Sequence, residues 1–261
     1  MVSSPPPTAL TIAGSDSGGG AGIQADLKTF HARGVHGLSA IAAITSQNTR
    51  GVAAVHPVPL AHIRSQIAAV FDDFPIGAVK TGMLGSAAIV RLVAREMALR
   101  KPAWLVVDPV MIATSGARLL DEGAIAVLVN KLIPLADVLT PNLPEAEALL
   151  GYPIRSAKDC TRAGNELREL GAKSVLLKGG HGSGRDVVDR YFDARGVMEL
   201  RHLRLKLEAH GTGCTLASAV AAELAKGQSP RSAVRRAVAY VQRALAQGYQ
   251  PGSAPLRVLA H

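Results

Sequence analysis

Short runs of apolar residues alternate along the chain with longer segments in which apolar residues recur at helical spacing. The apolar runs predict buried strands over residues 9–13, 38–45, 76–80, 104–108, 137–140 and 174–178, and a β-hairpin over 187–207. The periodic segments predict helices over 21–33, 60–74, 87–99, 122–132, 215–225 and 232–247, with two further helices between 140 and 174. Apolar strands that alternate with helices predict a three-layer α/β fold, in which helices cover both faces of a mostly parallel sheet.

The pattern continues without a linker or an internal repeat, so we expect a single domain over residues 9–261 after a flexible, proline-rich tail over 1–8. Hydrophobic residues make up 48% and charged residues 19% of the chain, which excludes a disordered protein. No apolar run is long enough to span a bilayer, and the first residues lack the features of a secretory signal. We therefore expect a cytoplasmic protein with no membrane partner.

The charge balance raises a nucleic-acid alternative. Lysine and arginine number 29 against 20 acidic residues, a formal net charge of +9. Aromatic residues amount to only 3% of the chain, however, which leaves few platforms on which bases can stack. The nearest approach to a basic stripe, Arg231, Arg235, Arg236 and Arg243, has a spacing typical of a solvated helix face. A positive field equally suits a polyanionic small substrate such as a nucleotide, so nucleic-acid binding is the second interpretation.

The first candidate site is the glycine-rich segment 14–22, which follows the first predicted strand and leads into a helix. Backbone N–H groups at such a turn can face a ligand. The segment matches neither the dinucleotide-binding pattern nor the Walker A pattern, so a flexible turn explains it equally well. Asp26 lies near the start of the helix, where a carboxylate also interacts favourably with the helix dipole.

The second candidate site is the segment 210–215, His-Gly-Thr-Gly-Cys-Thr, which precedes a long apolar helix. Small residues at a helix start leave consecutive N–H donors open, and these can form an anion hole. Cys214 lies at this positive end, where we expect the pKa of its thiol to be lowered. A buried structural cysteine beside a helix cap is the alternative, but the coincidence of thiol and donors favours function. Cys160 lies in an ordinary amphipathic helix and is expected to serve packing.

A third group combines carboxylates and a lysine at strand ends. Asp108 ends the strand over 104–108, and Asn142 and Glu145 follow the strand over 137–140. Oxygen ligands that converge from strand ends suit Mg²⁺, although Asn-x-x-Glu beside a proline is also typical of a helix capping box. Lys178 ends a further strand, where it either extends to solvent or places a positive charge on a phosphate. The eight histidines show no metal-ligand spacing, so no zinc site is expected.

Taken in order, these segments closely resemble the hydroxymethylpyrimidine/phosphomethylpyrimidine kinases of thiamine biosynthesis, in the ribokinase-like superfamily. The resemblance extends from about residue 10 to about residue 247. Its motifs are AGSD at 13–16, GIQADLK at 22–28, SQNT at 46–49, GML at 82–84, DPVM at 108–111, TPN at 140–142 with Glu145, KGGH at 178–181 and GTGC at 211–214.

The resemblance implies a ribokinase-like fold with a small β-hairpin or lid element, and a cytoplasmic homodimer. It implies an enzyme that uses ATP and Mg²⁺ to phosphorylate 4-amino-5-hydroxymethyl-2-methylpyrimidine and then its monophosphate. It assigns Gly14, Asp26, Gln47, Met83, Val110 and Cys214 to the pyrimidine pocket, Gly211, Thr212, Gly213 and Cys214 to a catalytic anion hole, Asp108 and Glu145 to the Mg²⁺ region, and Asn142 and Lys178 to the ATP phosphates. One position departs from the family, because Thr114 stands where many members carry a lysine.

The chemistry of these residues suits phosphoryl transfer, which needs positioning and charge neutralisation. We expect Lys178 and Mg²⁺ to hold the ATP phosphates, and the thiolate of Cys214 to accept the hydroxymethyl proton. The nearest alternative is a pyridoxal kinase, since some close relatives phosphorylate that similarly shaped heterocycle. Gln47 favours the pyrimidine, because its amide both donates and accepts and so matches a ring nitrogen beside an exocyclic amine.

Overall fold

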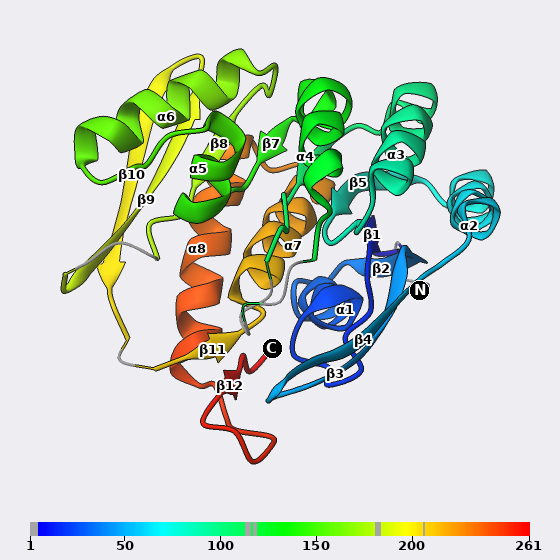
Figure 1. Ribbon diagram of the computed structural model, residues 1–261, viewed down its shortest axis with the longest axis horizontal. Helices are drawn as coiled ribbons and strands as arrows, with labels where there is room; N and C mark the ends of the chain where they lie inside the picture. Colours follow the sequence, from blue (N-terminus) through cyan, green and yellow to red (C-terminus); the bar gives the residue numbers. More distant parts are fainter. Residues whose placement is uncertain (1–4, 113–115, 117–118, 181–183, 206) are drawn as a thin grey trace.

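The computed structural model describes residues 5–112, 116, 119–180, 184–205 and 207–261, and an eight-stranded sheet lies at its centre (Figure 1). The strand order is β10-β9-β8-β7-β6-β5-β1-β2. Neighbouring strands from β8 to β2 are parallel, whereas β9 and β10 run antiparallel at one edge. The strands are β1 (Thr8–Ala13), β2 (His36–Ile41), β5 (Ile76–Thr81), β6 (Leu105–Val107), β7 (Val138–Leu139), β8 (Val175–Leu177), β9 (Asp186–Asp193) and β10 (Gly196–Leu203). The expected mostly parallel sheet and the expected hairpin at its edge are confirmed.

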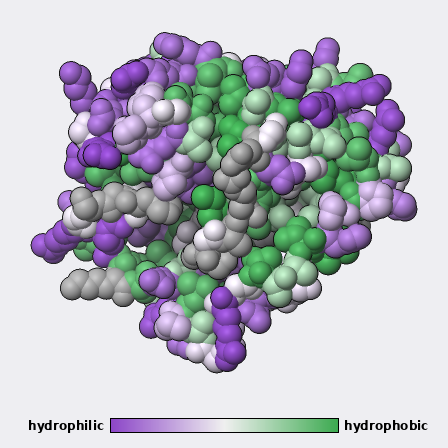
Figure 2. All heavy atoms as spheres, in the orientation of Figure 1, coloured by the Kyte–Doolittle hydropathy of each residue, from purple (hydrophilic) through white to green (hydrophobic). Residues whose placement is uncertain are grey.

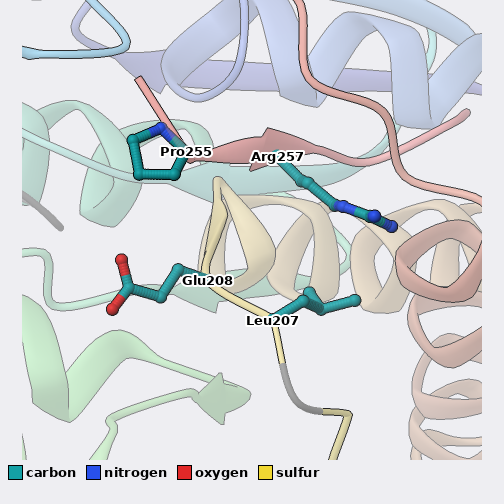
Figure 3. A pocket seen from close by; sticks show the side chains of 4 residues that line it. All are labelled: Leu207, Glu208, Pro255 and Arg257. Atoms are coloured by element: carbon teal, nitrogen blue, oxygen red, sulfur yellow. The ribbon is translucent and has the colours of Figure 1, made fainter. Parts of the chain in front are cut away.

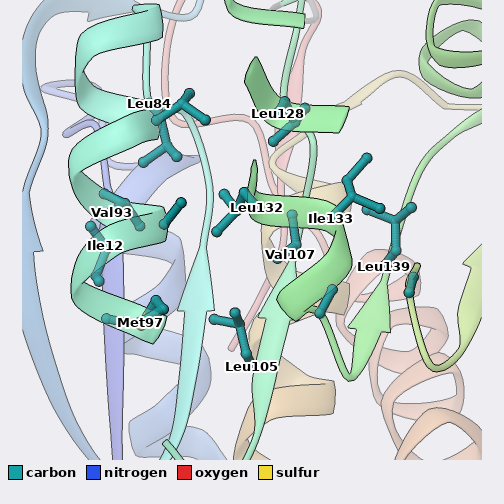
Figure 4. Close-up of a cluster of buried hydrophobic side chains, with 14 of the residues drawn as sticks. Ile12, Leu84, Val93, Met97, Leu105, Val107, Leu128, Leu132, Ile133 and Leu139 are labelled. Atoms are coloured by element: carbon teal, nitrogen blue, oxygen red, sulfur yellow. The ribbon is translucent and has the colours of Figure 1, made fainter. Parts of the chain in front are cut away.

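Helices cover both faces of the sheet, because both sets of alternating strand side chains are apolar. Leu105 and Val107 belong to one buried cluster, shown in Figure 4, and Val106 belongs to the cluster on the other face. The first face carries α2 (Leu60–Asp73), α3 (Ala87–Arg100), α4 (Glu122–Val127), α5 (Leu143–Leu150) and α6 (Ala157–Glu169), and the second carries α1 (Gly22–Ala32), α7 (Thr212–Ala225) and α8 (Pro230–Ala246). The three-layer architecture is as predicted, and Cys160 is buried in the first cluster as expected.

The parallel strands end at one edge of the sheet, and this edge collects the polar motifs. Gly14 follows β1, Gly82 follows β5, Asp108 follows β6, Thr140 follows β7 and Lys178 follows β8. In an open α/β sheet the ligand lies beyond the carboxyl ends of the strands. The topology therefore brings residues from distant motifs to a common place.

The segment expected as one strand over 38–45 is instead divided, so this prediction is wrong. β2 ends at Ile41, and β3 (Ala43–Asn48) leaves the sheet to pair with β4 (Gly51–Pro57) in a separate antiparallel hairpin that the sequence did not predict. The chain leaves because it bonds to the end of β1 and to the loop that follows: Ala42 N–H donates to Ala13 O, and Ala43 O accepts from Ser15 N–H. The hairpin turn is supported by Asn48 Oδ1, which accepts from Arg50 N–H at 2.8 Å.

The single helix expected over 122–132 is also irregular. α4 ends at Val127, a π-helical turn spans Leu128–Leu132, and a 3₁₀ turn spans Ile133–Leu135. Pro134 has no backbone N–H to continue an α-helix, which accounts for the change at this end.

Two further details concern the start of the first strand and a short strand pair near the end of the chain. β1 begins at Thr8, one residue before the expected domain boundary, and β11 (Ala209–His210) pairs with β12 (Arg257–Val258). None of the helices formed by the described residues is long and apolar enough to cross a membrane.

Candidate active site

A cavity of about 800 Å³ lies where the parallel strands end, next to the start of α7. Nearly all the residues that the sequence singled out line it, namely Gly14, Gln47, Met83, Asp108, Val110, Asn142, Glu145, Lys178, Gly211, Thr212, Gly213 and Cys214. Asp26 alone among the predicted site residues is not part of this lining. Thr114 lies outside the described residues.

The start of α7 forms one wall of the cavity. Gly211 precedes the helix with φ +81°, and a Cβ there would lie 1.9 Å from Gly20 O, so only glycine fits. The helix begins at Thr212, earlier than the expected residue 215, which places Gly213 and Cys214 in its first turn. The first N–H groups of a helix have no intrahelical acceptor, so this turn offers donors to an anion in the cavity.

The thiol of Cys214 does not have the lowered pKa that its place at the helix start predicted. Burial raises its pKa to about 11, and the nearby cation of Lys80 lowers it less than burial and Asp26 raise it. Desolvation of the thiolate thus outweighs the helix dipole. The free protein therefore holds Cys214 as a neutral thiol at neutral pH.

Lys80, which the sequence analysis did not single out, is the second-to-last residue of β5 and lines the cavity. Its side chain is fully buried, and Nζ donates to both carboxylate oxygens of Asp26, at 2.9 and 2.8 Å. Asp26 also accepts from Thr11 Oγ1 at 2.6 Å and from Ser218 Oγ at 2.7 Å. Burial alone would lower the pKa of Lys80, but the attraction of Asp26 raises it. Asp26 thus holds Lys80, and Lys80 rather than Asp26 reaches the cavity wall.

Lys178, which also lines the cavity, is shared between two carboxylates. Its Nζ lies 2.9 Å from Asp108 Oδ1 and 3.8 Å from Glu145 Oε2. Thr140 Oγ1 donates to the same Asp108 oxygen at 2.9 Å. Burial alone would lower the pKa of Lys178, but Asp108 and Glu145 together raise it. A Cβ on Gly213 would lie 3.2 Å from Lys178 Nζ, which places this lysine against the first turn of α7.

Glu145 also belongs to the capping box that the sequence offered as an alternative. Its Oε2 accepts from Asn142 N–H at 2.8 Å, and Asn142 Oδ1 accepts from Glu145 N–H at 2.8 Å. Burial raises the pKa of Glu145 to about 7, and Lys178 offsets only part of that effect while Asp108 adds to it. The carboxyl group is therefore both a helix cap and an ionisable group in the cavity wall.

Another part of the cavity wall is formed by Gly14, Met83 and Gln47. Gly14 N–H donates to Met83 O at 3.0 Å, and a Cβ on Gly14 would lie 2.9 Å from Met83 Sδ. Gln47 reaches this end from β3, and its amide nitrogen lies 2.8 Å from His210 Nε2. The division of the strand at Ala42 is what directs Gln47 into the cavity.

Two further carboxylates support the cavity walls and were missed as site residues. Asp16 accepts backbone N–H groups within the glycine-rich turn, and Asp189 accepts from Gly179 N–H at 2.8 Å directly after Lys178. Asp16 could have been found, because it opens the glycine-rich turn whose N–H groups it accepts, whereas the sequence does not show that Asp189 holds the segment after Lys178. Lys80 carried a signal that could have been used: like Lys178, it ends an apolar parallel strand.

A second, smaller depression has a simpler lining. A depression of about 430 Å³ is lined by Leu207, Glu208, Pro255 and Arg257, and in Figure 3 the two charged side chains point to opposite sides. The described residues contain no cluster of three or more His, Cys, Asp or Glu able to hold a metal ion.

The basic residues of α8 do not form one stripe. Arg235, Arg236 and Arg243 are exposed as expected, but Arg231 binds both oxygens of Asp193, at 2.7 and 2.6 Å. Figure 2 shows hydrophilic residues spread around one face of the molecule with apolar residues between them.

The comparisons with known proteins agree with this geometry. The chain is 48% identical over 254 residues to the hydroxymethylpyrimidine/phosphomethylpyrimidine kinase of Haemophilus influenzae, covering 93% of this chain and 94% of that protein. It is also 48% identical to the thiamine biosynthesis bifunctional protein ThiED of Geobacter sulfurreducens, but spans only 51% of that protein's length while 95% of this chain is matched. A crystal structure of Bacillus subtilis pyridoxal kinase in complex with ADP is similar, with a TM-score of 0.91, 35% identity and coverage of 98% of this chain and 97% of that one.

The sequence resemblance is thus matched by a ribokinase-like neighbour in three dimensions. The family model described as phosphomethylpyrimidine kinase matches residues 16–258, which is nearly the whole chain. The chain belongs to the phosphomethylpyrimidine kinase family.

Proposed function

We propose that this protein is an ATP-dependent kinase that phosphorylates 4-amino-5-hydroxymethyl-2-methylpyrimidine and then the resulting monophosphate. One observation carries the proposal: a single cavity is lined by Gln47, by the shared cation Lys178 and by the open start of α7. Phosphoryl transfer requires an acceptor and a triphosphate on either side of a group that receives charge.

The acceptor occupies the end lined by Gly14, Gln47, Met83 and Val110. A side chain at position 14 would meet Met83 Sδ, so glycine lets both residues line this part of the cavity together. The Gln47 amide hydrogen-bonds the polar edge of the ring. The hydroxymethyl oxygen then points to the first turn of α7, next to Cys214.

The phosphates of ATP occupy the end at Lys178 and Asn142. Lys178 places a positive charge beside the first turn of α7, where the backbone N–H groups of residues 212–214 receive the charge that develops on the transferred group. The same groups serve both phosphorylation steps, because both steps use ATP.

The residues around Lys178 fit a Mg²⁺ ion. Two carboxylates, Asp108 and Glu145, share one lysine, so full ionisation leaves the cluster with an excess negative charge that a cation relieves. Mg²⁺ commonly takes one or two carboxylates together with phosphate oxygens. When bound, it would neutralise the ATP phosphates, with Asp108 and Glu145 holding it.

Cys214 is the candidate base for the first step, but not as a thiolate present beforehand. Because the pKa of its thiol is about 11, only a small fraction of Cys214 is ionised at neutral pH, and only this thiolate can accept the hydroxymethyl proton. The neighbouring Lys80 cation stabilises that form, which gives the buried pair beneath the cavity a role in the chemistry.

Pyridoxal phosphorylation is the second candidate, favoured by the structural similarity to a pyridoxal kinase. The experiment incubates the purified protein with ATP, Mg²⁺ and either heterocycle, and counts phosphates on the product. We expect the pyrimidine to receive two phosphates in succession; exclusive turnover of pyridoxal would overturn the proposal.

Gln47→Met should reduce pyrimidine kcat/KM by at least about tenfold and spare pyridoxal turnover, because the polar edge of the pyrimidine loses its partner. Equal losses on both substrates would show that Gln47 does not select between them.

A homodimer and a cytoplasmic location remain predictions, as does the lack of a nucleic-acid partner. The dimer is supported by the β3–β4 hairpin, which stands apart from the central sheet and exposes Ile44 and Val55. Sedimentation equilibrium measures the oligomeric state, and retention on heparin at rising salt tests nucleic-acid binding.

A further inference from the structure

Asp16, Gln47 and His210 come from distant parts of the chain and meet at the acceptor end of the cavity. His210 Nε2 lies 3.2 Å from Asp16 Oδ2 and 2.8 Å from the amide nitrogen of Gln47. A single ring nitrogen thus faces both a carboxylate and an amide. If that nitrogen carries a proton it donates a hydrogen bond, and if it is bare it accepts one, so its protonation decides the direction of both contacts.

Asp16 requires the proton. Its carboxylate accepts N–H bonds from Gly18 at 2.8 Å, Gly20 at 3.0 Å and Ala21 at 2.8 Å. Burial alone would raise the pKa of Asp16, but the bonds from His210 and these backbone groups lower it. An ionised carboxylate offers only lone pairs, so its contact with His210 is attractive only when Nε2 is protonated.

A protonated Nε2 determines how the Gln47 amide must turn. An amide NH₂ group 2.8 Å away would set one donor against another, whereas the amide oxygen accepts. The two ends of an amide have the same shape, so a half-turn about the last side-chain bond exchanges them without displacing a neighbour.

Thr45 fits the exchanged arrangement. Its hydroxyl donates to Ser15 O at 2.8 Å and lies 3.3 Å from the end of the Gln47 amide that faces away from His210. A hydroxyl has one proton, so it cannot donate fully to two acceptors, but it can accept from an NH₂ group. Every polar group of the cluster is then satisfied.

The rest of the cluster is held in place. Ser17 Oγ accepts from Gln47 N–H and donates to Gln47 O, both at 2.7 Å. The His210 ring packs against Gly20, where a Cβ would approach Cδ2 to 2.9 Å. The Gln47 backbone and the His210 ring are therefore fixed, and what remains to be determined is which end of the Gln47 amide faces His210.

We propose that His210 is a positioning residue that fixes this order, with the Gln47 oxygen toward His210 and its NH₂ group toward Thr45. One oxygen lone pair and one N–H then remain for the substrate, to accept from an exocyclic amine and to donate to the adjacent ring nitrogen. When the positions of the amide oxygen and NH₂ group are fixed, an aminopyrimidine ring can form both hydrogen bonds in only one orientation. That orientation determines where its hydroxymethyl group points. The inference rests on the proposed pyrimidine substrate.

The first test needs no substrate, so its failure is distinct from failure of the proposed function. In protein labelled with ¹⁵N-histidine, the imidazole nitrogen shifts distinguish a protonated Nε2 from a bare one, and the spectrum of His210→Gln assigns the signal. We expect Nε2 of His210 to carry a proton, and Asp16→Asn to shift the signal toward the bare form. A bare Nε2 in the unaltered protein would overturn the proposal.

The second test is kinetic. His210→Phe keeps a ring but removes the donor, so we expect KM for the pyrimidine to rise about tenfold while kcat and the KM for ATP change by less than about twofold. His210→Gln carries an NH₂ group that can replace Nε2–H, so we expect it to restore most of the loss. An equal fall in kcat for both variants would indicate general damage and contradict the proposal.

A double-mutant cycle shows whether His210 acts through Gln47. In the Gln47→Met background, His210→Phe should have no further effect on the pyrimidine KM, whereas independent roles would give additive losses. If His210→Phe does not fold, the same cycle with His210→Leu, which also removes the donor, and the spectrum of Asp16→Asn still decide the outcome.

Discussion

Two buried lysines at the ends of parallel strands differ in what surrounds them, and the difference separates scaffold from site. Lys80 has one carboxylate partner, Asp26, whose oxygens are also bonded to Thr11 and Ser218. Lys178 has two carboxylate partners, Asp108 and Glu145, and it borders the cavity beside α7. The first cluster is neutral and complete. The second has one negative charge more than its lysine can neutralise, so it can accept a proton or a cation.

Burial is the main cause of the raised pKa of Glu145, about 7; Lys178 offsets part of this effect, and the charge of Asp108 adds to it. Cys214 lies between the two clusters and responds to both, since Lys80 lowers its pKa while Asp26 and Asp108 raise it. A buried lysine at a strand end is thus no site by itself. The surplus of carboxylates around it is the distinguishing feature.

Breaking the complete cluster should have the largest effect, on stability. Asp26→Asn leaves the fully buried Lys80 charge without a carboxylate, which should lower the free energy of unfolding by about 3–5 kcal/mol, measured by urea denaturation. Replacing both partners, Lys80→Met with Asp26→Leu, should recover most of this loss. The control is Lys173→Met, which removes an exposed partner of Asp137 and should change stability by less than about 1 kcal/mol. Equal effects at both sites would refute the distinction.

Breaking the open cluster should act on catalysis. Lys178→Ala removes the cation beside the first turn of α7 and should reduce kcat/KM about 10²–10³-fold in both phosphorylation steps. Lys158→Ala, on the exposed surface of α6, serves as the control for loss of a lysine. A loss confined to one step would mean that Lys178 contacts the acceptor and not ATP.

The role of Cys214 separates the two steps. Cys214→Ala should slow phosphorylation of the hydroxymethyl group roughly a hundredfold, because a neutral alcohol must lose its proton. The monophosphate is already anionic near neutral pH, so its phosphorylation should fall much less. Equal losses in the two steps would assign Cys214 to shaping the anion hole, and Cys160→Ala is the matched cysteine control.

The pH profile gives a sharper form of this prediction. A base whose pKa in the free protein is about 11 is present in increasing amount as pH rises, so kcat/KM for the first step should still increase between pH 7 and 9. That increase should be absent in Cys214→Ala.

Glu145→Gln keeps the acceptor of the capping box, so its effect should appear chiefly in how stability depends on pH. The pKa of Glu145 is raised from 4.5 to about 7, so the folded protein holds a proton that the unfolded chain releases between these values. The contribution of this group to stability is therefore present below pH 4.5 and lost as pH rises to about 7, by up to about 3 kcal/mol. Stability of the variant relative to the unaltered protein should increase over this range in urea titrations. A difference in stability that stays constant across pH would contradict the raised pKa of Glu145. The variant should also need a higher Mg²⁺ concentration for activity, because it loses one of the two carboxylates proposed to hold the ion.

The strand-ending motifs were predictable because hydrophobic patterning and parallel topology are nearly local properties. A run such as 104–108 identifies a buried strand, and the carboxyl ends of parallel strands meet at one edge, so Asp108 and Lys178 were expected near each other. The open donors near Gly211 were predictable because small residues precede an apolar helix, although the helix begins at Thr212 and not at the predicted residue 215.

The tertiary structure decided what depends on partners distant in sequence. The strand over 38–45 divides because Ala42 and Ala43 bond to the loop after β1, which the local pattern does not show. Asp26 turns inward because Lys80, Thr11 and Ser218 surround it. The pKa of Cys214 follows from desolvation, which depends on all that packs around the thiol, and for that reason it moved opposite to the helix-dipole expectation. The sequence by itself determined which residues reach the site edge, whereas their charge states and contacts depended on the folded surroundings.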